Sequence, residues 1–234
     1  MSQFSSSKVE CPACGAGFAF ELVHSVNADR MPELRKQIVA ETFQRMTCPK
    51  CSSDFRVEPD FNYVEHGRNL WIAALPLERL TRWKQEEADA QALFERVYGA
   101  RGSPFMQAIG KRIARRLTFG WAGVREKLVI ADHGLDDLTV ELCKSAVLRA
   151  SASAPVGLGA EMRLMGADET HLHFAWLRSL DESVAQTMRA SRKLYDEIAA
   201  DEDGQWQPLR GQFGGMFVDI GRLLVVPEES PLAD

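Results

Sequence analysis

The sequence has no apolar run long enough to cross a membrane. A transmembrane helix needs about 20 consecutive apolar residues, and no window of this chain approaches that length. The N-terminal segment, MSQFSSSKVE, also lacks the apolar stretch of a signal peptide. We therefore expect a cytoplasmic protein with no membrane span.

Positive charge is the second feature in short supply. The chain has 28 Lys and Arg residues against 33 Asp and Glu residues, which gives a formal net charge of −5. This balance excludes a general electrostatic attraction to nucleic acid or to an anionic membrane, but it does not exclude a local basic patch. The apolar fraction of 45% is typical of a soluble globular protein with its own hydrophobic core.

The common catalytic motifs are also missing from the sequence. It has no GxSxG motif, no phosphate-binding loop with its lysine and no HExxH motif. No grouping of a nucleophile with a base and an acid is evident along the chain. These absences favour a non-enzymatic protein.

Cysteine is scarce, but four of the five cysteines follow a pattern. Thiols stay reduced in a cytoplasmic protein, so these residues do not indicate a disulfide scaffold. Cys11 with Cys14, and Cys48 with Cys51, form two CPxC pairs in which both sulfurs can face one point. Two such pairs supply four thiolates in a tetrahedron, which suits a structural Zn²⁺ with bonds of about 2.3 Å. Four protein ligands leave no open position on the metal, so we do not expect a Lewis-acid catalyst.

Two other readings of the cysteines stay open. A CPxC pair at the start of a helix can act as a redox centre, and the same four ligands can hold an iron–sulfur cluster. The segments that follow the two pairs, residues 18–23 and 55–57, have an extended rather than a helical pattern. This pattern favours zinc over redox chemistry.

The pattern of the chain predicts an α+β fold. After a disordered, Ser-rich N-terminus at residues 1–7, a zinc-ribbon-like β unit is expected over residues 8–76. The 33 residues between Cys14 and Cys48 exceed the usual gap between cysteine pairs. A short helix at residues 32–40, with Pro32 in its first turn, explains this length.

The middle of the chain, residues 77–150, is expected to be helical and to complete an 8–150 zinc-binding domain. The predicted helices cover residues 77–98, 105–117 and 135–150. A linker at 151–159 precedes a C-terminal α+β part at 160–228 and a tail at 229–234. That part is expected to hold a hairpin over 162–177, a helix capped by Asp181 and a final strand over 216–226.

Four cations on the predicted helix 105–117 are candidate phosphate contacts. They are Lys111, Arg112, Arg115 and Arg116. A simpler reading is the solvated face of a helix that packs by its other side. His171 and His173 share one face of a predicted strand, with Glu169 as the nearest third ligand, and a solvated strand face is again the simpler reading.

Several stretches of the sequence resemble the CpXC family of bacterial proteins. They are Cys11 to Phe20, Ser25-Val26-Asn27-Ala28, Pro32-Glu33-Leu34, Thr47-Cys48-Pro49-Lys50-Cys51 with Phe55-Arg56-Val57, Arg125-Glu126-Lys127-Leu128-Val129-Ile130, and Gly134-Leu135-Asp136-Asp137 with Val140-Glu141-Leu142. The similarity spans about residues 8–150 and implies a zinc-binding domain without an assigned activity. One departure is Ser52, where a glycine would be commoner after the second thiol.

These observations predict a non-enzymatic protein, stabilised by zinc, that acts as a scaffold or interaction module for a protein partner. The first alternative is a zinc-ribbon protein that binds nucleic acid through the basic residues. The second alternative is an enzyme with its site in the C-terminal part.

Overall fold

The computed structural model describes residues 2–151, 159–179, 181–201 and 204–225. The chain divides into two compact units, one made of Met1–Arg79 with Asp89–Trp121 and the other of Leu80–Ala88 with Ala122–Asp234. Both units combine helices with strands, so the predicted α+β class is confirmed. The predicted domain limits stay predictions, and most of the linker and all of the tail lie outside the described residues.

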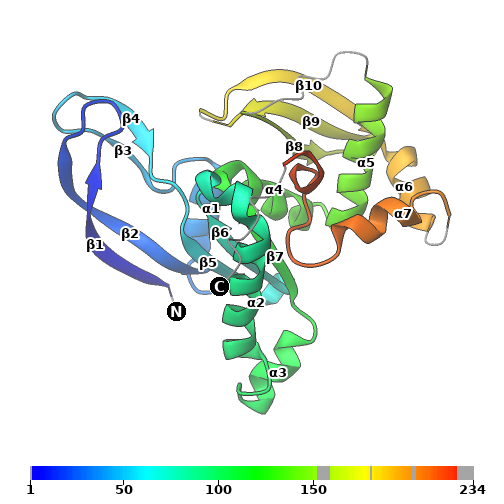
Figure 1. Cartoon of the computed structure of the whole chain (residues 1–234), viewed down its shortest axis with the longest axis horizontal. Helices are drawn as coiled ribbons and strands as arrows, with labels where there is room; N and C mark the ends of the chain where they lie inside the picture. The colour runs from blue at the N-terminus through cyan, green and yellow to red at the C-terminus, as the bar shows by residue number, and fades with distance from the viewer. Residues whose placement is uncertain (1, 152–158, 180, 202–203, 226–234) are drawn as a thin grey trace, which may run out of the picture. The chain divides into compact units, whose positions relative to one another are not determined.

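The first unit contains a five-stranded mixed sheet with the order β1-β2-β5-β6-β7 (Figure 1). Its strands are β1 (Gln3–Glu10), β2 (Gly17–Asn27), β5 (Phe61–Glu65), β6 (Leu70–Leu75) and β7 (Ala114–Phe119). The pairs β1–β2 and β5–β6 are antiparallel, while β2–β5 and β6–β7 are parallel. Strand β6 reads Leu-Trp-Ile-Ala-Ala-Leu and is almost wholly buried, as expected for an inner strand with both faces covered.

The predicted disorder of residues 1–7 is wrong for residues 3–7, which belong to β1. These residues pair with β2 from Phe4 opposite Val23 to Ser7 opposite Phe20. A serine-rich segment has no apolar pattern to reveal a strand, because here the backbone ladder to the neighbouring strand supplies the order.

The predicted helix at residues 105–117 is also wrong in its second half. Helix α3 (Pro104–Gly110) ends early, and β7 follows it. The apolar repeat that suggested one long helix is satisfied differently, since Ile113 and Leu117 are buried next to and within a strand. Leu117 lies opposite Ala73 of β6, so the backbone bonds of this segment go to the sheet.

The remaining elements of the first unit include a helix between the two cysteine pairs and a small hairpin around the second pair. The elements are α1 (Pro32–Val39), β3 (Arg45–Thr47), β4 (Asp54–Arg56) and the 3₁₀ turn η1 (His66–Arg68). The predicted helix at 32–40 is thus confirmed, with Pro32 in its first turn. The predicted helix at 77–98 consists of a 3₁₀ segment, η2 (Leu77–Arg82), and α2 (Trp83–Tyr98), which contributes residues to both units.

The second unit is built on a three-stranded antiparallel sheet with the order β10-β9-β8. Its elements are α4 (Gly120–Asp132), α5 (Asp137–Ala150), β8 (Ala160–Ala167), β9 (His171–Arg178), β10 (Val184–Ser191), α6 (Arg192–Ala200), α7 (Gln207–Arg210), η3 (Gly211–Phe213) and α8 (Gly221–Leu224). The predicted hairpin at 162–177 and helix at 135–150 are confirmed. The helix expected after Asp181 is wrong at its start, because β10 comes first and Ser191 caps α6. The final strand expected at 216–226 is wrong for residues 216–225, which form turns and α8.

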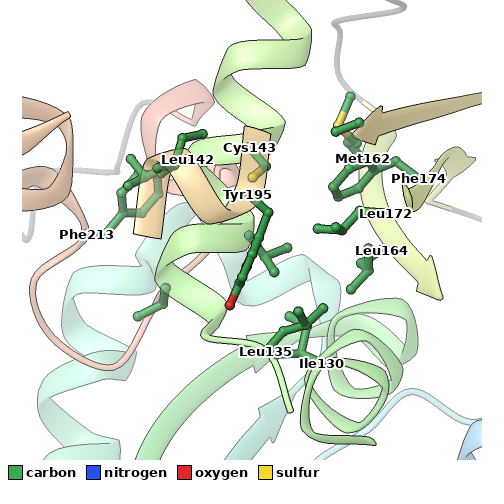
Figure 2. Close-up of a cluster of buried hydrophobic side chains, with 14 of the residues drawn as sticks. Ile130, Leu135, Leu142, Cys143, Met162, Leu164, Leu172, Phe174, Tyr195 and Phe213 are labelled. Carbon is green, nitrogen blue, oxygen red and sulfur yellow. The ribbon is translucent and has the colours of Figure 1, made fainter. Parts of the chain in front are cut away.

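Helices α5 and α6 pack against one face of this sheet and form the core of the second unit (Figure 2). Leu142 and Cys143 of α5, Tyr195 of α6, and Leu172 and Phe174 of β9 all belong to this core, in which Leu142 lies beside Phe213 (Figure 2). Burial raises the pKa of the Cys143 thiol to about 12, so this fifth cysteine is an inert part of the core. None of the described helices combines the length and the apolarity that a membrane crossing requires.

Candidate metal centre

Each cysteine pair occupies the tip of a β-hairpin in the first unit. Cys11 and Cys14 lie between β1 and β2, where Glu10 and Gly17 form the last strand pair. Cys48 and Cys51 lie in the same way between β3 and β4. Strand pairing therefore positions each pair of thiols from both sides.

The two hairpin tips have the same backbone geometry. The carbonyl of Cys11 accepts a hydrogen bond from the N–H of Gly15 at 2.8 Å, and the carbonyl of Cys48 accepts one from Ser52 at 2.9 Å. In both tips the N–H of the first cysteine donates to the carbonyl five residues later, at 3.0 and 2.9 Å. The residue after the second thiol is left-handed in both, with φ of 69° at Gly15 and 58° at Ser52. Ser52 thus adopts the conformation that glycine favours, and the departure from the family pattern does not change the turn.

The four sulfur atoms converge on one point. All four lie within 4.8 Å of one another. The Sγ atoms of Cys11 and Cys51 are 3.7 Å apart, and those of Cys14 and Cys48 are 3.8 Å apart. A tetrahedron with Zn–S bonds of about 2.3 Å has edges of about 3.8 Å, whereas a disulfide has sulfurs about 2.05 Å apart. The spacing therefore fits a four-thiolate metal site, and all four cysteines are free of disulfides.

The electrostatics of the Cys48 and Cys51 thiols also fit a cation. The N–H groups of Cys51 and Lys50 lower the pKa of the Cys48 thiol to about 6. The pKa of Cys51 rises to about 12, because contacts with the other thiols and burial outweigh the N–H of Ser53. Without a cation, ionising one sulfur thus disfavours ionising its neighbour, and a divalent metal would remove this conflict.

Two contacts hold the β3–β4 hairpin against β2. The side chain of Gln44 accepts a hydrogen bond from the N–H of Val23 at 3.3 Å and donates one to the carbonyl of Glu21 at 3.1 Å. Phe18 of β2 and Phe55 of β4 pack edge to face, with ring centroids 6.2 Å apart. These contacts bring the second pair of cysteines to the first.

The candidate phosphate contacts do not share one helix face. Lys111 and Arg112 follow α3 and are exposed, while Arg115 and Arg116 lie on β7 and are half-buried. Arg115 donates to Gln91 at 3.2 Å, and its guanidinium lies over the ring of Phe94. The four cations therefore split into an exposed pair and a pair engaged within the unit.

His171 and His173 lie on β9 with their ring centroids 6.3 Å apart. The Nε2 atom of His173 is 2.7 Å from a carboxylate oxygen of Asp168. Among the residues that the structure describes, the four cysteines are the only group of three or more potential ligands within reach of one ion. The histidines thus have no described third ligand.

A buried ion network in the second unit was not anticipated from the sequence. Its members are Glu126, Lys127, Asp137, Glu141, Lys144, Glu161, Arg163 and Asp219. The Nζ atom of Lys144 lies 2.7 Å from Glu126 and 2.9 Å from Glu141, and all three side chains are fully buried. Arg163 of β8 reaches Glu126 at 3.0 Å and also pairs with Asp219.

The second cation of α4, Lys127, extends this network. Its Nζ atom is 3.2 Å from Asp137 and donates to the carbonyl of Val218 at 2.5 Å. The N–H of Ile220 donates to Glu141 at 2.8 Å. Four members fall in the blocks that carry the family resemblance. Their shielding from solvent indicates a structural network that joins α4 and α5 to β8 and the 218–220 segment.

A family model described as CpXC protein matches residues 9–144, which contain all four clustered cysteines. No curated protein matches the chain, and no solved structure matches it.

Proposed function

The chain belongs to the CpXC protein family, and from this premise we propose that it is a non-catalytic cytoplasmic scaffold whose N-terminal β unit is stiffened by one structural Zn²⁺. The ligands would be Cys11, Cys14, Cys48 and Cys51. The observation that carries this proposal is the match between the sulfur spacings of 3.7 and 3.8 Å and the edge of a Zn–S tetrahedron.

The hairpin geometry supports zinc over redox chemistry. A reactive CPxC thiol is usually activated at the start of a helix, whereas both pairs here lie in hairpin turns and face each other. An iron–sulfur cluster could use the same four thiolates, and it would be recognised by the colour and the iron content of the purified protein. Four thiolates on one zinc leave no position for a substrate, which supports a structural rather than a catalytic ion.

The β3–β4 hairpin is an element that zinc binding would stabilise. Each of its strands has only three residues, and none of their side chains is fully buried. An isolated two-stranded hairpin is at best marginally stable in water. Zinc binding would therefore contribute directly to the folding free energy of this hairpin and would fix the surface that it presents to a protein partner.

The test is elemental analysis of protein purified without added metal, followed by limited proteolysis. We expect about one zinc per chain in the wild type, none in Cys11→Ser/Cys48→Ser, and faster cleavage of the variant between residues 41 and 57. Cys143→Ala is the matched control, because it removes a buried thiol outside the cluster and should keep the zinc. Iron in place of zinc, or unchanged protease resistance of the double variant, would contradict the proposal.

A further inference from the structure

The segment around the turn between α2 and α3 carries an unusual local charge. Residues 96–125 contain seven Lys and Arg residues and no Asp or Glu, in a chain that has 33 acidic residues. Four of these cations lie in residues 96–112, which we call the α2–α3 tip: Arg96, Arg101, Lys111 and Arg112. An acidic protein thus presents one strongly basic segment.

The four cations of the tip are available for a partner. Each is exposed, and none forms a side-chain hydrogen bond or ion pair with another described residue. Arg115, by contrast, lies 3.7 Å from Glu95 and is half-buried. Repulsion among unpaired cations costs folding free energy, and an anionic partner would remove that cost.

The α2–α3 tip also carries an exposed aromatic ring. Phe105 in α3 is 72% exposed, the largest exposure of any big apolar side chain in the described part of the chain. The turn that carries it is well defined, because Ser103 caps α3 and the amide of Gln107 donates to the carbonyl of Gly102 at 2.8 Å. Gly110 packs so tightly on Tyr98 that a Cβ atom there would come within 2.7 Å of the tyrosine side chain. The exposed ring is therefore carried by a well-defined helix, α3, which follows α2 at the end of the first unit (Figure 1).

The tip has the features of a single-stranded nucleic-acid site. Such sites combine cations that follow the phosphates with aromatic rings on which bases stack. Three of the four cations are arginines, whose planar guanidinium suits phosphate and base contacts. The other large apolar residues of α3, Met106 and Ile109, are half-buried, so the helix lacks the broad apolar face of a membrane-bound helix.

We propose that the α2–α3 tip binds single-stranded nucleic acid, with Phe105 stacking on a base and Arg96, Arg101, Lys111 and Arg112 contacting phosphates. This partner is additional to the zinc-stabilised scaffold and does not depend on the identity of the metal. Lys111 and Arg112 of the tip are also two of the four candidate phosphate contacts that the sequence predicts.

The test is fluorescence anisotropy of full-length, metal-loaded protein with a labelled oligothymidylate of about 20 nucleotides, longer than one typical site. Four phosphate contacts predict a slope of about −3 for log affinity against log salt. Lys111→Glu/Arg112→Glu should abolish binding at low salt. The matched control Arg30→Glu/Lys36→Glu makes the same charge change on exposed residues of the same unit and should bind nearly as the wild type.

Two further measurements separate nucleic acid from other partners. Phe105→Leu keeps an apolar side chain but removes the ring, and it should weaken oligonucleotide binding roughly 5- to 150-fold, whereas Phe105→Trp should preserve it. No binding by the wild type at low salt, or equal loss in the control variant, would overturn the proposal. Tighter binding to phosphatidylglycerol vesicles or to polyglutamate, unchanged in Phe105→Leu, would also overturn it. Zinc content and protease resistance should stay unchanged in every tip variant, so failure here is distinct from failure of the zinc proposal.

Discussion

The ammonium group of Lys144 lies 2.7 Å from the carboxylate of Glu126, and both side chains are completely shielded from solvent. Moving two charges out of water is costly, and their attraction offsets this cost only when further hydrogen bonds complete the site. Here Glu141 and Arg163 supply the additional partners. The pair is therefore stable as a part of the network, whereas either ion without its partner would be costly to bury.

Lys144→Met should destabilise the protein by about 3–5 kcal/mol, because it leaves Glu126 and Glu141 buried without their shared cation. Chemical unfolding followed by circular dichroism measures this loss. The control is Lys193→Met, since Lys193 pairs with Glu197 on the surface with 85% of its side chain exposed. That change should alter the free energy of unfolding by less than about 1 kcal/mol. A double-mutant cycle with Glu126→Gln should recover part of the loss, and strict additivity would argue against coupling within the network.

Glu141→Gln should change how stability depends on pH. Burial raises the pKa of Glu141 to about 7, with Lys144 opposing and Glu126 reinforcing the shift. Its unfolded value is about 4.3, so the folded state takes up a proton as pH falls from about 7 to 4.5. Wild-type stability should gain roughly 1–3 kcal/mol from this group over that range, and the glutamine variant should gain none of it.

The stability gap, defined as the free energy of unfolding of the wild type minus that of Glu141→Gln, should therefore become more positive from pH 7.5 to pH 5. Taking the difference between the two proteins removes the contributions of histidines and thiols. The pKa values of Glu126 and Asp219 are lowered, so their stabilisation is lost only in more acidic solution. A gap that stays constant across this range would mean that Glu141 remains ionised.

The clustering of the four cysteines could be predicted from the sequence because its information is local. Each CPxC pair fixes two sulfurs within one turn, and Cys11 and Cys48 begin turns of the same design. The helix between the pairs was also predictable, since Pro32 marks its first turn. The approach of the two hairpins depends on Gln44 and on the contact between Phe18 and Phe55, which no local pattern reveals.

The strand β7 and the ion network could not be predicted for a different reason. The spacing of Ile109, Ile113 and Leu117 fits a helix, and only pairing with β6 makes residues 114–119 a strand. The network collects charges from α4, α5, β8 and Asp219, which are far apart in the sequence. Its one local hint is α5, where Glu141 and Lys144 lie one turn apart in a helix that is buried on almost every side.

Asp136 caps α5, and its replacement should separate a hydrogen bond from a charge effect. Its carboxylate accepts a hydrogen bond from the N–H of Thr139 at 2.8 Å. Asp136→Ala should lower the free energy of unfolding by about 1 kcal/mol, whereas Asp136→Asn should retain most of the cap. Ser191→Ala at the cap of α6 is the comparison. Equal losses in the alanine and asparagine variants would assign the effect to the helix dipole instead of the cap.

The matched hairpin tips predict opposite effects of two substitutions. Gly15 and Ser52 occupy equivalent left-handed positions, with φ of 69° and 58°. A Cβ atom at Gly15 would meet no other atom within 4 Å, so Gly15→Ala tests the backbone conformation alone.

A left-handed backbone costs a residue with a Cβ roughly 1–2 kcal/mol, and Gly15→Ala should therefore destabilise the zinc-loaded protein by about that amount. Ser52→Gly should stabilise it by up to about 1 kcal/mol, because the relief of strain exceeds the entropy that glycine adds to the unfolded chain. Thermal unfolding and zinc retention against a competing chelator measure both effects. If the two variants shift in the same direction, the equivalence of the two turns does not extend to their energetics.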